Sequence, residues 1–384
     1  MKIIIERKKL LDSIVKVHAI VEKRNIMPIL EHVKIDINSN SIFFTTTDLD
    51  VTVRDSFHIN YEGEISFTVA VQPLYDITKK LNNNDILEFN LAEVENGRIE
   101  ISAGQGKITI PCLNSYEFPS FEILTDYSSF EIGNSDLRRL LLKTKHAMAS
   151  GEMRYYLNGI NLKTENDLLI SAATDVHRLA MSSVTKPDDL FIPEGFIIPK
   201  KTVNEIIKLT ESLKDEDKVT INISENRISL QIHNTILISK LIHGKYPNYS
   251  SIFAIQPDRR ISVDVKELAN AVELVSAIAD GKIKIVTIHV NNHSLIVSAD
   301  SSKDGKHSTA QQEINVESTF FKNDIPEEPI SFMLNAKYLL DVLSISIGPR
   351  IHLNISTPTA PVIIKDMADS DSTYVLMPMQ LENT

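Results

Sequence analysis

The stretch ISFTVA at residues 65–70, which leads into LYDI at 74–77, decides the fold because its pattern occurs twice more. The other copies are FIIP at 196–199 before VNEI at 203–206, and ISFMLNA at 330–336 before LLDV at 339–342. Each copy is typical of a short strand followed at once by an amphipathic helix with an acidic residue between apolar ones. The copies lie about 130 residues apart, which is too long for a solenoid and indicates a repeated small domain.

A second marker repeats with the same period. Apolar stripes with helical spacing open at Leu11, Leu137 and Leu268, and in each copy the other helix follows about 60 to 70 residues later. This order predicts an α+β fold of three similar domains. Their predicted bounds are 1–125, 126–254 and 255–384, with 111–127 as the first linker.

Individual elements can also be predicted. The apolar spacing predicts helices over 6–22 and 74–81, and Asn134-Ser135-Asp136 and Asp264 are expected to cap later helices. The glycines at 104–106 indicate a hairpin turn, because Ile101 stands where a phosphate loop needs glycine. Residues 300–305 are expected to form a polar loop, because Gln311 stands where a calcium loop has its bidentate Glu.

The net charge of −11 points away from nucleic acid, but the charges are unevenly distributed. Acidic residues gather in the expected turns at 214–217, 326–328 and 366–371. The expected helices hold basic side chains: Arg7, Lys8, Lys9, Lys16, Lys79, Lys80, Arg138, Arg139, Lys143, Lys145, Lys200, Lys201 and Lys208. Basic helices on an acidic body predict one positive surface, whereas solvated helix faces are the alternative interpretation.

The composition narrows the class of protein. A single cysteine, Cys112, excludes an internal disulfide and is expected to be a small buried hydrophobe in a reducing cytoplasm. The charged start at residues 1–6 argues against a signal peptide, and no apolar run is long enough to cross a bilayer. The histidines lack metal-ligand spacing. We therefore expect a cytoplasmic protein with no membrane segment, metal or cofactor.

Asp175-Val176-His177-Arg178 is the cluster most like a catalytic site. An Asp and a His could orient one another for base catalysis, but no nucleophile motif lies nearby. A structural or binding role is favoured, and no catalytic residue is assigned. A hydrolase using Asp175 and His177 and a three-domain adaptor that binds only protein remain alternatives.

The C-terminal stretch YVLMPM at 374–379 combines apolar residues with methionines. Methionines suit varied peptide partners, because their side chains adapt to different shapes. Pro378 cannot donate to a strand ladder, so the strand should stop there and leave Met379 near a surface.

Several segments of the chain resemble those of a known family. The chain resembles the bacterial DNA polymerase III beta subunit, the DNA sliding clamp, over essentially its whole length. The matching segments are MPIL at 27–30, TDLD at 47–50, YEFP at 116–119, RYYLNG at 154–159, ATDVHRLA at 173–180, SKL at 239–241, YPNY at 246–249 and YVLMPM at 374–379.

The resemblance implies a DNA clamp fold and a function. Two chains would form a head-to-tail homodimer ring, with helices lining a central hole and antiparallel sheets outside. The ring would be a non-catalytic processivity factor that encircles double-stranded DNA without reading its sequence, in the bacterial cytoplasm near the nucleoid. It would tether the polymerase catalytic subunit, the clamp loader and other replication and repair proteins that carry a clamp-binding motif.

The resemblance also implies three sets of site residues. The DNA-binding residues would be Arg24, Arg154, Tyr155, Lys200 and Lys201. The peptide-binding groove between the second and third domains would comprise Leu157, Thr174, His177, Arg178, Leu179, Pro247, Ile252, Asn335, Tyr338, Val375, Met377, Pro378 and Met379. The dimer interface would pair an edge strand at Lys107, Ile108 and Ile110 with the third domain near Ala277 and Ile278, with ion pairs from Lys107 or Arg98 to Asp300 or Asp304.

Several positions depart from the family pattern. Gln72-Pro73 and Gly151 stand where two DNA contacts are usual. Around the groove, Val176 replaces a usual Gly, and Ser251, Pro361, Gln380 and the tail at 382–384 also differ. Peptide preference is therefore expected to differ from that of other members.

Overall fold

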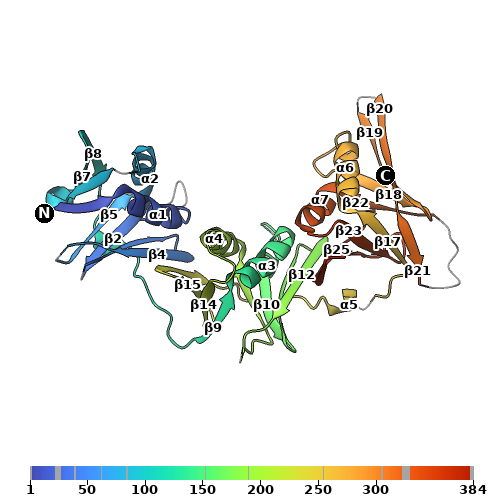
Figure 1. The fold of residues 1–384 in the computed structure, drawn as a ribbon, viewed down its shortest axis with the longest axis horizontal. Helices are drawn as coiled ribbons and strands as arrows, with labels where there is room; N and C mark the ends of the chain where they lie inside the picture. Colours follow the sequence, from blue (N-terminus) through green and yellow to red (C-terminus); the bar gives the residue numbers. More distant parts are fainter. Residues whose placement is uncertain are drawn as a thin grey trace. The chain divides into compact units, whose positions relative to one another are not determined.

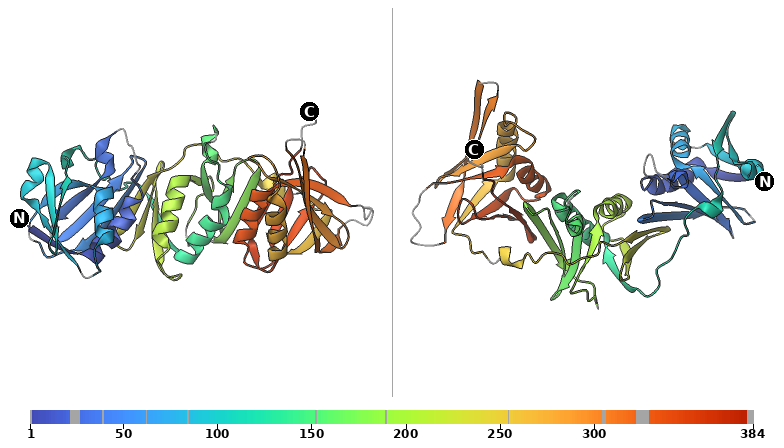
Figure 2. Two further views of the ribbon diagram at one scale, coloured as in Figure 1. Left: turned by 90° about the horizontal axis from the view of Figure 1, so that it is seen from above. Right: turned by 180° about the vertical axis from the view of Figure 1, so that it is seen from behind.

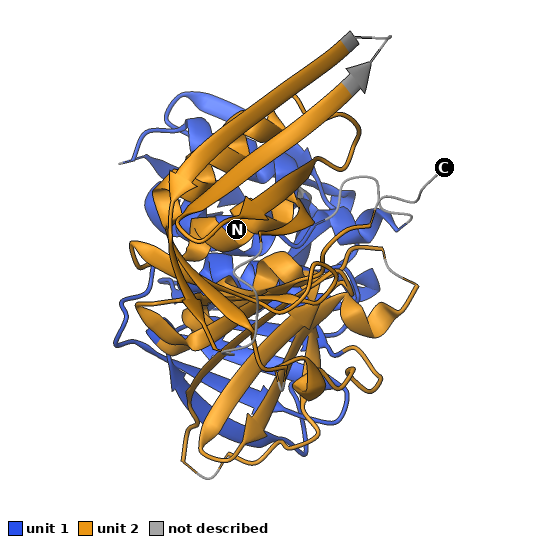
Figure 3. Ribbon diagram, turned by 90° about the vertical axis from the view of Figure 1, so that its right-hand side faces the viewer, with its two compact units in different colours: residues 1–135, 201–241 blue, residues 136–200, 242–384 orange. Residues whose placement is uncertain are grey.

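The computed structural model describes the chain except for residues 1, 22–26, 39, 62, 84, 152, 189, 254, 304–305, 322–328 and 381–384. The chain forms two compact units (Figure 3). Unit 1 comprises residues 1–135 and 201–241, and unit 2 comprises residues 136–200 and 242–384. Arg24, Asp304 and the tail at 382–384, which the sequence analysis singled out, lie outside the described residues.

Unit 1 contains a long antiparallel sheet and a short one. The long sheet has the order β5 (Ile65–Ala70), β2 (His32–Asn38), β3 (Ser41–Thr47), β4 (Val51–His58), β16 (Thr235–Lys240), β15 (Arg227–Ile232), β14 (Lys218–Ile223) and β9 (Ser128–Gly133). The short sheet has the order β1 (Lys2–Glu6), β6 (Ile86–Asn90), β7 (Arg98–Ala103) and β8 (Gly106–Pro111).

Unit 2 repeats this plan. Its long sheet has the order β13 (Phe196–Pro199), β10 (Gly159–Glu165), β11 (Leu168–Thr174), β12 (Arg178–Thr185), β25 (Asp369–Leu376), β24 (Val362–Asp366), β23 (Arg350–Ile355), β17 (Arg259–Asp264) and β21 (Glu317–Phe320). Its short sheet has the order β20 (Lys306–Asn315), β19 (Ser294–Lys303), β18 (Ile285–Val290) and β22 (Ile330–Asn335).

The long sheets run across the predicted domain borders. β4 pairs with β16 in unit 1, and β12 pairs with β25 in unit 2, so each sheet joins segments from two predicted domains. This continuity is why the compact units differ from the three predicted ranges. The borders at 125/126 and 254/255 stay a prediction.

The helices pack on the sheets of their own unit (Figures 1 and 2). In unit 1, α1 (Arg7–His18) packs against α2 (Val71–Lys80) and against β3 and β4. In unit 2, α6 (Val265–Ser276) packs against α7 (Ala336–Ile345) and against β18, β19 and β20. The remaining helices are α3 (Asn134–Thr144), α4 (Lys200–Thr210), α5 (Ser250–Phe253) and the 3-10 helices η1 (Pro28–Glu31), η2 (Leu91–Asn96), η3 (Ser115–Glu117), η4 (Lys145–Ala147) and η5 (Tyr155–Leu157).

The threefold repeat is confirmed. A strand runs directly into a helix at β5–α2, β13–α4 and β22–α7, as the repeated stretch predicts. The second marker behaves in the same way, since β1, β9 and β17 lead directly into α1, α3 and α6. The predicted hairpin turn between β7 and β8 is also confirmed, and Gly104 adopts φ 58° there.

Several predicted element bounds are wrong for local reasons. α1 ends at His18 rather than at 22, and the Val17 carbonyl there accepts from the Thr46 hydroxyl at 2.6 Å. Asn134 does not cap α3; its buried side-chain amide donates to the carbonyls of Leu213 and Lys214 at 3.3 and 3.2 Å. The cap at Asp264 is confirmed, since its carboxylate accepts from the backbone of Lys266 and Glu267.

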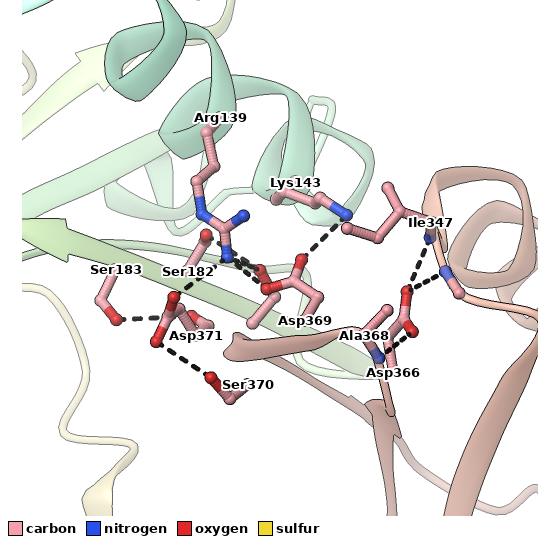
Figure 4. Close-up of polar contacts among 12 residues, drawn as sticks. Arg139, Lys143, Ser182, Ser183, Ile347, Asp366, Ala368, Asp369, Ser370 and Asp371 are labelled. Carbon is pink, nitrogen blue, oxygen red and sulfur yellow. Dashed lines mark hydrogen bonds and ion pairs between the residues drawn. The ribbon is translucent and has the colours of Figure 1, made fainter.

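The expected polar loop at 300–305 is also wrong, and the acidic turn at 366–371 has a buried part. Residues 300–303 belong to β19, which continues past β18 paired with β20 and projects from the sheet (Figures 1 and 3). The acidic turn at 366–371 is not purely a surface feature, because Asp366 and Asp369 are buried. The Asp366 carboxylate accepts from the N–H groups of Ala368 in the turn and of Ile347, whereas the Asp369 carboxylate pairs with Lys143 of α3 (Figure 4).

Candidate functional site

The predicted groove residues gather around the seam between β12 and β25. These strands pair in antiparallel register, with Arg178 opposite Leu376 and Leu179 opposite Val375. Beyond the paired residues, the backbone N–H of Met377 donates to the His177 carbonyl at 2.9 Å. β25 ends at Leu376, before Pro378 as predicted, and the exposed side chain of Met377 follows directly.

The turn before β12 is built by Thr174 and Asp175. The Thr174 hydroxyl donates to the Arg178 carbonyl at 2.6 Å and accepts from the Val176 N–H at 3.1 Å. Asp175 Oδ1 accepts from the N–H groups of His177 and Arg178 at 3.1 and 3.0 Å. These bonds hold Val176 at φ 78°, in the left-handed region.

Arg178 is a buried structural link rather than a free cation at the groove rim. Its guanidinium donates to Asp175 Oδ2 at 3.0 Å and to Asp341 Oδ2 at 2.5 Å. It also lies over the ring of Tyr338, 4.1 Å from the centroid. Because Asp341 and Tyr338 belong to α7, Arg178 ties the turn before β12 to α7.

An apolar cluster lies beneath this turn. Buried Leu179 and Val375 join Ala172, Tyr249 and Ile363, and partly buried Ile252 packs against them with Met181, Tyr246 and Phe253. The Tyr246 hydroxyl accepts from the Thr174 N–H at 2.9 Å, which links the cluster to the turn. Burial raises the pKa of Tyr249 to about 12, so its hydroxyl stays neutral.

The structure places the other predicted groove residues at different depths. His177 and Pro247 are exposed, whereas Leu157 is buried at the end of η5. Asn335 caps α7 through its side-chain oxygen. Met379 forms an isolated β-bridge with Met333, and its N–H donates to the Met333 carbonyl at 2.8 Å.

Sequence reasoning missed His146 and Asp341. Asp341 could have been found, since it is the acidic residue between apolar ones in the third repeated helix. His146 had no sequence signal, because its place beneath the seam depends on non-local packing against the Tyr374 ring, 5.8 Å away. Burial first, with the Arg178 charge next, lowers the pKa of His146 to about 4.

Three of the five predicted DNA-binding residues lie together in unit 2. Arg154 and Tyr155 are exposed at the start of η5, and Asn158, just after η5, accepts the Lys200 N–H at 3.0 Å. The Lys200 ammonium donates to the Ser150 hydroxyl. Lys201 belongs to unit 1, where its ammonium pairs with buried Asp48. Arg24 lies outside the described residues.

Many helical basic residues have internal partners, which limits the predicted positive surface. Buried Arg7 donates to the Thr78 carbonyl at 2.8 Å, and Lys16 lies 3.0 Å from buried Asp55. Arg139 and Lys143 both pair with Asp369. These side chains are expected to stabilise the fold rather than contact phosphates.

The predicted dimer residues lie in two different places, on the edge strand β8 and just after the helix α6. β8 and β20 each form one end of a short sheet. On β8, Ile108 is partly exposed and Lys107 pairs with Glu100 of the same chain at 3.7 Å. Ile110 is already buried within unit 1, so it has little surface left for a dimer contact. Ala277 and Ile278 follow α6, which packs against β20.

The geometry does not favour a hydrolase. Both carboxylate oxygens of Asp175 have partners in the turn and in Arg178, so the carboxylate is committed to holding the turn. Burial raises the pKa of the Cys112 thiol to about 11, which agrees with the expected small buried hydrophobe and makes the thiolate scarce at neutral pH. Within the described ranges, no helix is both long and apolar enough to span a bilayer.

Comparison with known proteins gives full-length matches. Family models of the DNA polymerase III beta subunit match in order: the N-terminal domain at 1–122, the central domain at 131–248 and the C-terminal domain at 250–380. The beta sliding clamp of Caulobacter vibrioides (strain NA1000 / CB15N) is 29% identical over 99% of this chain and 100% of the relative. That of Pseudomonas aeruginosa is 29% identical over 98% and 99%.

Solved structures give the same result. The DNA polymerase III subunit beta sliding clamp from Bartonella birtlesii, bound to griselimycin, superposes with a TM-score of 0.90 at 30% identity, covering 99% of this chain and 100% of that one. The Caulobacter crescentus pol III beta structure gives 0.89 at 29% identity over 99% and 100%. The three-domain α+β clamp fold with antiparallel sheets is therefore confirmed, and the chain belongs to the DNA polymerase III beta subunit family, the bacterial beta sliding clamps.

Proposed function

We propose that two copies of this chain close head to tail around duplex DNA and tether the replicative polymerase through the seam between β12 and β25. As a member of the beta sliding clamp family, the protein is a processivity factor of DNA polymerase III and a non-catalytic subunit. The ring, the DNA-facing residues, the partners and a cytoplasmic, nucleoid-associated location belong to our proposal.

The hydrogen bond from Met377 to His177 carries the proposal for the groove. It brings the Met377-Pro378-Met379 segment beside the 174–178 turn and next to the apolar cluster of Leu179 and Val375. Partly exposed apolar side chains beside backbone groups and an exposed His suit an extended peptide with apolar anchors. The polymerase catalytic subunit, the clamp loader and other proteins with a clamp-binding motif would supply such peptides.

Unlike edge strands support a head-to-tail ring. β8 of unit 1 and β20 of unit 2 both carry backbone groups at the end of a sheet, and such edges pair readily. A contact between two different edges is heterologous and closes a ring when its rotation permits. We propose that β8 of one chain pairs with β20 of the other, with Ile108 packing near Ala277 and Ile278 at the end of α6.

The Arg154, Tyr155 and Lys200 group supports a DNA contact that does not depend on sequence. Cationic and polar side chains track phosphates without reading base edges. An acidic body of net charge −11 would repel DNA elsewhere, so retention would depend on the closed ring rather than on tight binding.

Deleting residues 377–384 tests the groove. The deletion removes the Met377 and Met379 backbone contacts and should abolish binding of a polymerase catalytic subunit in surface plasmon resonance. Light scattering should still find a dimer, because β8 and β20 are untouched. Met367→Ser is the matched control, since Met367 is another exposed methionine, on the turn between β24 and β25. Loss of the dimer on deletion, or unchanged polymerase binding, would contradict the proposed groove.

A further inference from the structure

The 174–178 turn has a twin in unit 1, at residues 47–51. There the Thr47 hydroxyl donates to the Val51 carbonyl at 3.1 Å and accepts from the Leu49 N–H at 3.0 Å. Asp48 Oδ1 accepts from the N–H groups of Asp50 and Val51 at 2.9 and 2.6 Å. Each of these bonds has its counterpart in the 174–178 turn.

The two turns also meet the next strand in the same way. The N–H of Lys240, at the end of β16, donates to the Asp50 carbonyl at 2.9 Å, as Met377 donates to His177. Polar side chains link the paired strands at matching places, with Thr235 bound to Asp55 in unit 1 and Ser182 bound to Ser372 in unit 2. The two seams therefore share the same turn and the same strand pairing.

The middle residue of each turn has the same unusual backbone. Leu49 and Val176 both adopt φ 78°. Side chains rarely occupy this region, and a β-branched residue such as Val176 is a clear outlier there. Such strain persists only where the surroundings impose it, and it concentrates at binding sites. The Thr and Asp side chains impose the turn, so its middle residue can vary without changing the scaffold.

The chemistry around the two middle residues differs. In unit 1, Asp50 and Lys240 form an ion pair at 2.9 Å beside Leu49, which is 48% exposed. In unit 2, the corresponding residues are His177 and Met377, and Val176 and Met377 are 47% and 38% exposed. Val176, next to His177 in the chain, and Met377, whose N–H donates to the His177 carbonyl, are thus two solvent-exposed apolar residues at this seam.

We propose that Val176 is a specificity-determining residue of the peptide groove. Its isopropyl group contacts one apolar side chain of the bound peptide and, with Met377, selects an apolar over a charged residue at that position. This inference rests on the proposed groove function. Covering two half-exposed methyl groups with a ligand strengthens binding about five- to tenfold.

The twin turn supplies a matched control. Val176→Gly and Leu49→Gly relieve the same left-handed strain and add the same backbone freedom, so their melting temperatures should shift in the same direction. Only Val176→Gly removes a groove contact. Val176→Ala keeps a side chain at the turn but loses both methyl groups, which separates the contact from backbone flexibility.

The full-length dimer is probed with an array of eight-residue peptides that carry Ala, Leu, Met, Phe, Asp or Lys at each position in turn. The tightest peptide is then measured by fluorescence anisotropy. We expect Val176→Gly and Val176→Ala to weaken binding five- to tenfold and to flatten the apolar preference at one position, while Leu49→Gly stays within twofold.

Equal changes in Val176→Gly and Leu49→Gly, or tighter binding by Val176→Gly, would overturn the role of Val176 alone. Wild-type protein that binds no peptide, or Met377→Ser that binds as wild type does, would overturn the groove and this inference with it. The two failures are therefore distinguishable.

Discussion

The ammonium of Lys143 on α3 lies 3.0 Å from Oδ2 of Asp369 at the start of β25, and both side chains are largely buried. Arg139 pairs with the other oxygen of this carboxylate, and Lys143 also donates to the Ile345 carbonyl at 2.7 Å (Figure 4). Burial opposes the charge of Asp369, but hydrogen bonds from Lys143 and Arg139 outweigh it and lower the pKa of Asp369. The cluster therefore ties α3 to β25, the strand that ends at the seam with β12.

Asp369→Asn should destabilise the protein strongly. The substitution leaves two cations without a buried counter-charge, which typically costs about 3–5 kcal/mol of unfolding free energy. Asp371→Asn is the matched control, because Asp371 is exposed and lies 3.7 Å from the same Arg139. Its loss should stay below about 1 kcal/mol. Urea denaturation of both variants measures the difference, and similar losses would show that the Asp369 cluster contributes no more than a surface pair.

Acidification should reveal the partly buried His146. Its pKa of about 4 lies below the ordinary value of 6.5, so the unfolded chain binds more protons between these pH values and stability falls as the pH drops through this window. His146→Phe keeps a ring against Tyr374 and should reduce this loss by roughly 1–3 kcal/mol. Some loss should remain, because burial also lowers the pKa of His32 and His352.

Unfolding free energies at pH 7.5 and 5 measure this effect. His293→Phe is the control, because His293 is exposed and its substitution should leave the slope unchanged. If His146→Phe loses as much stability on acidification as the wild type, His146 is not the group that titrates.

The neighbouring lysines at the start of α4 should behave differently. Lys200→Ala should reduce the salt dependence of binding to a short duplex by about one phosphate contact, with little change in stability. Lys201→Ala should lower the melting temperature, because it removes a partner from buried Asp48. Lys218→Ala is the control, because the Lys218 side chain is 70% exposed and pairs with Glu131. It should change neither the salt dependence of duplex binding nor the melting temperature. Identical behaviour of the two α4 variants would contradict this division of roles.

The two isoleucines of β8 should also respond differently to substitution. Ile108→Asp places a charge in the proposed joint and should give a folded monomer in light scattering. Ile110 is 2% exposed, so Ile110→Ala should instead cost about 2–5 kcal/mol of unfolding free energy. A dimeric Ile108→Asp would rule out this strand as the joint.

The repeated strand–helix stretch predicts the fold because it depends on local spacing, which the sequence displays directly. Local signals also predict the cap at Asp264 and the end of β25 before Pro378. The buried charges were not predictable in this way. Lys143 and Arg139 look like the other basic residues of the expected helices, and only the register of β12 against β25 brings Asp369 to them.

The candidate site was likewise only partly predictable from the sequence. The resemblance identifies the residues around the seam, including Arg178, but it does not predict that the Arg178 guanidinium is bound to Asp175 and Asp341. Val176 itself gives no local signal of a left-handed backbone, because left-handed turns usually contain Gly or Asn. The resemblance, which has a usual Gly at this position, does indicate it. The twin at 47–51 could have been noticed from the shared Thr-Asp pair, yet only the hydrogen bonds establish it.

The central claim is that the protein stays on DNA because its ring encloses the duplex. The most direct measurement compares retention of the labelled clamp, loaded by a matched clamp loader with ATP, on nicked circular DNA and on the same DNA after linearisation. We expect stable retention on the circle and rapid loss from the free ends of the linear form. Equal retention on both would contradict topological enclosure.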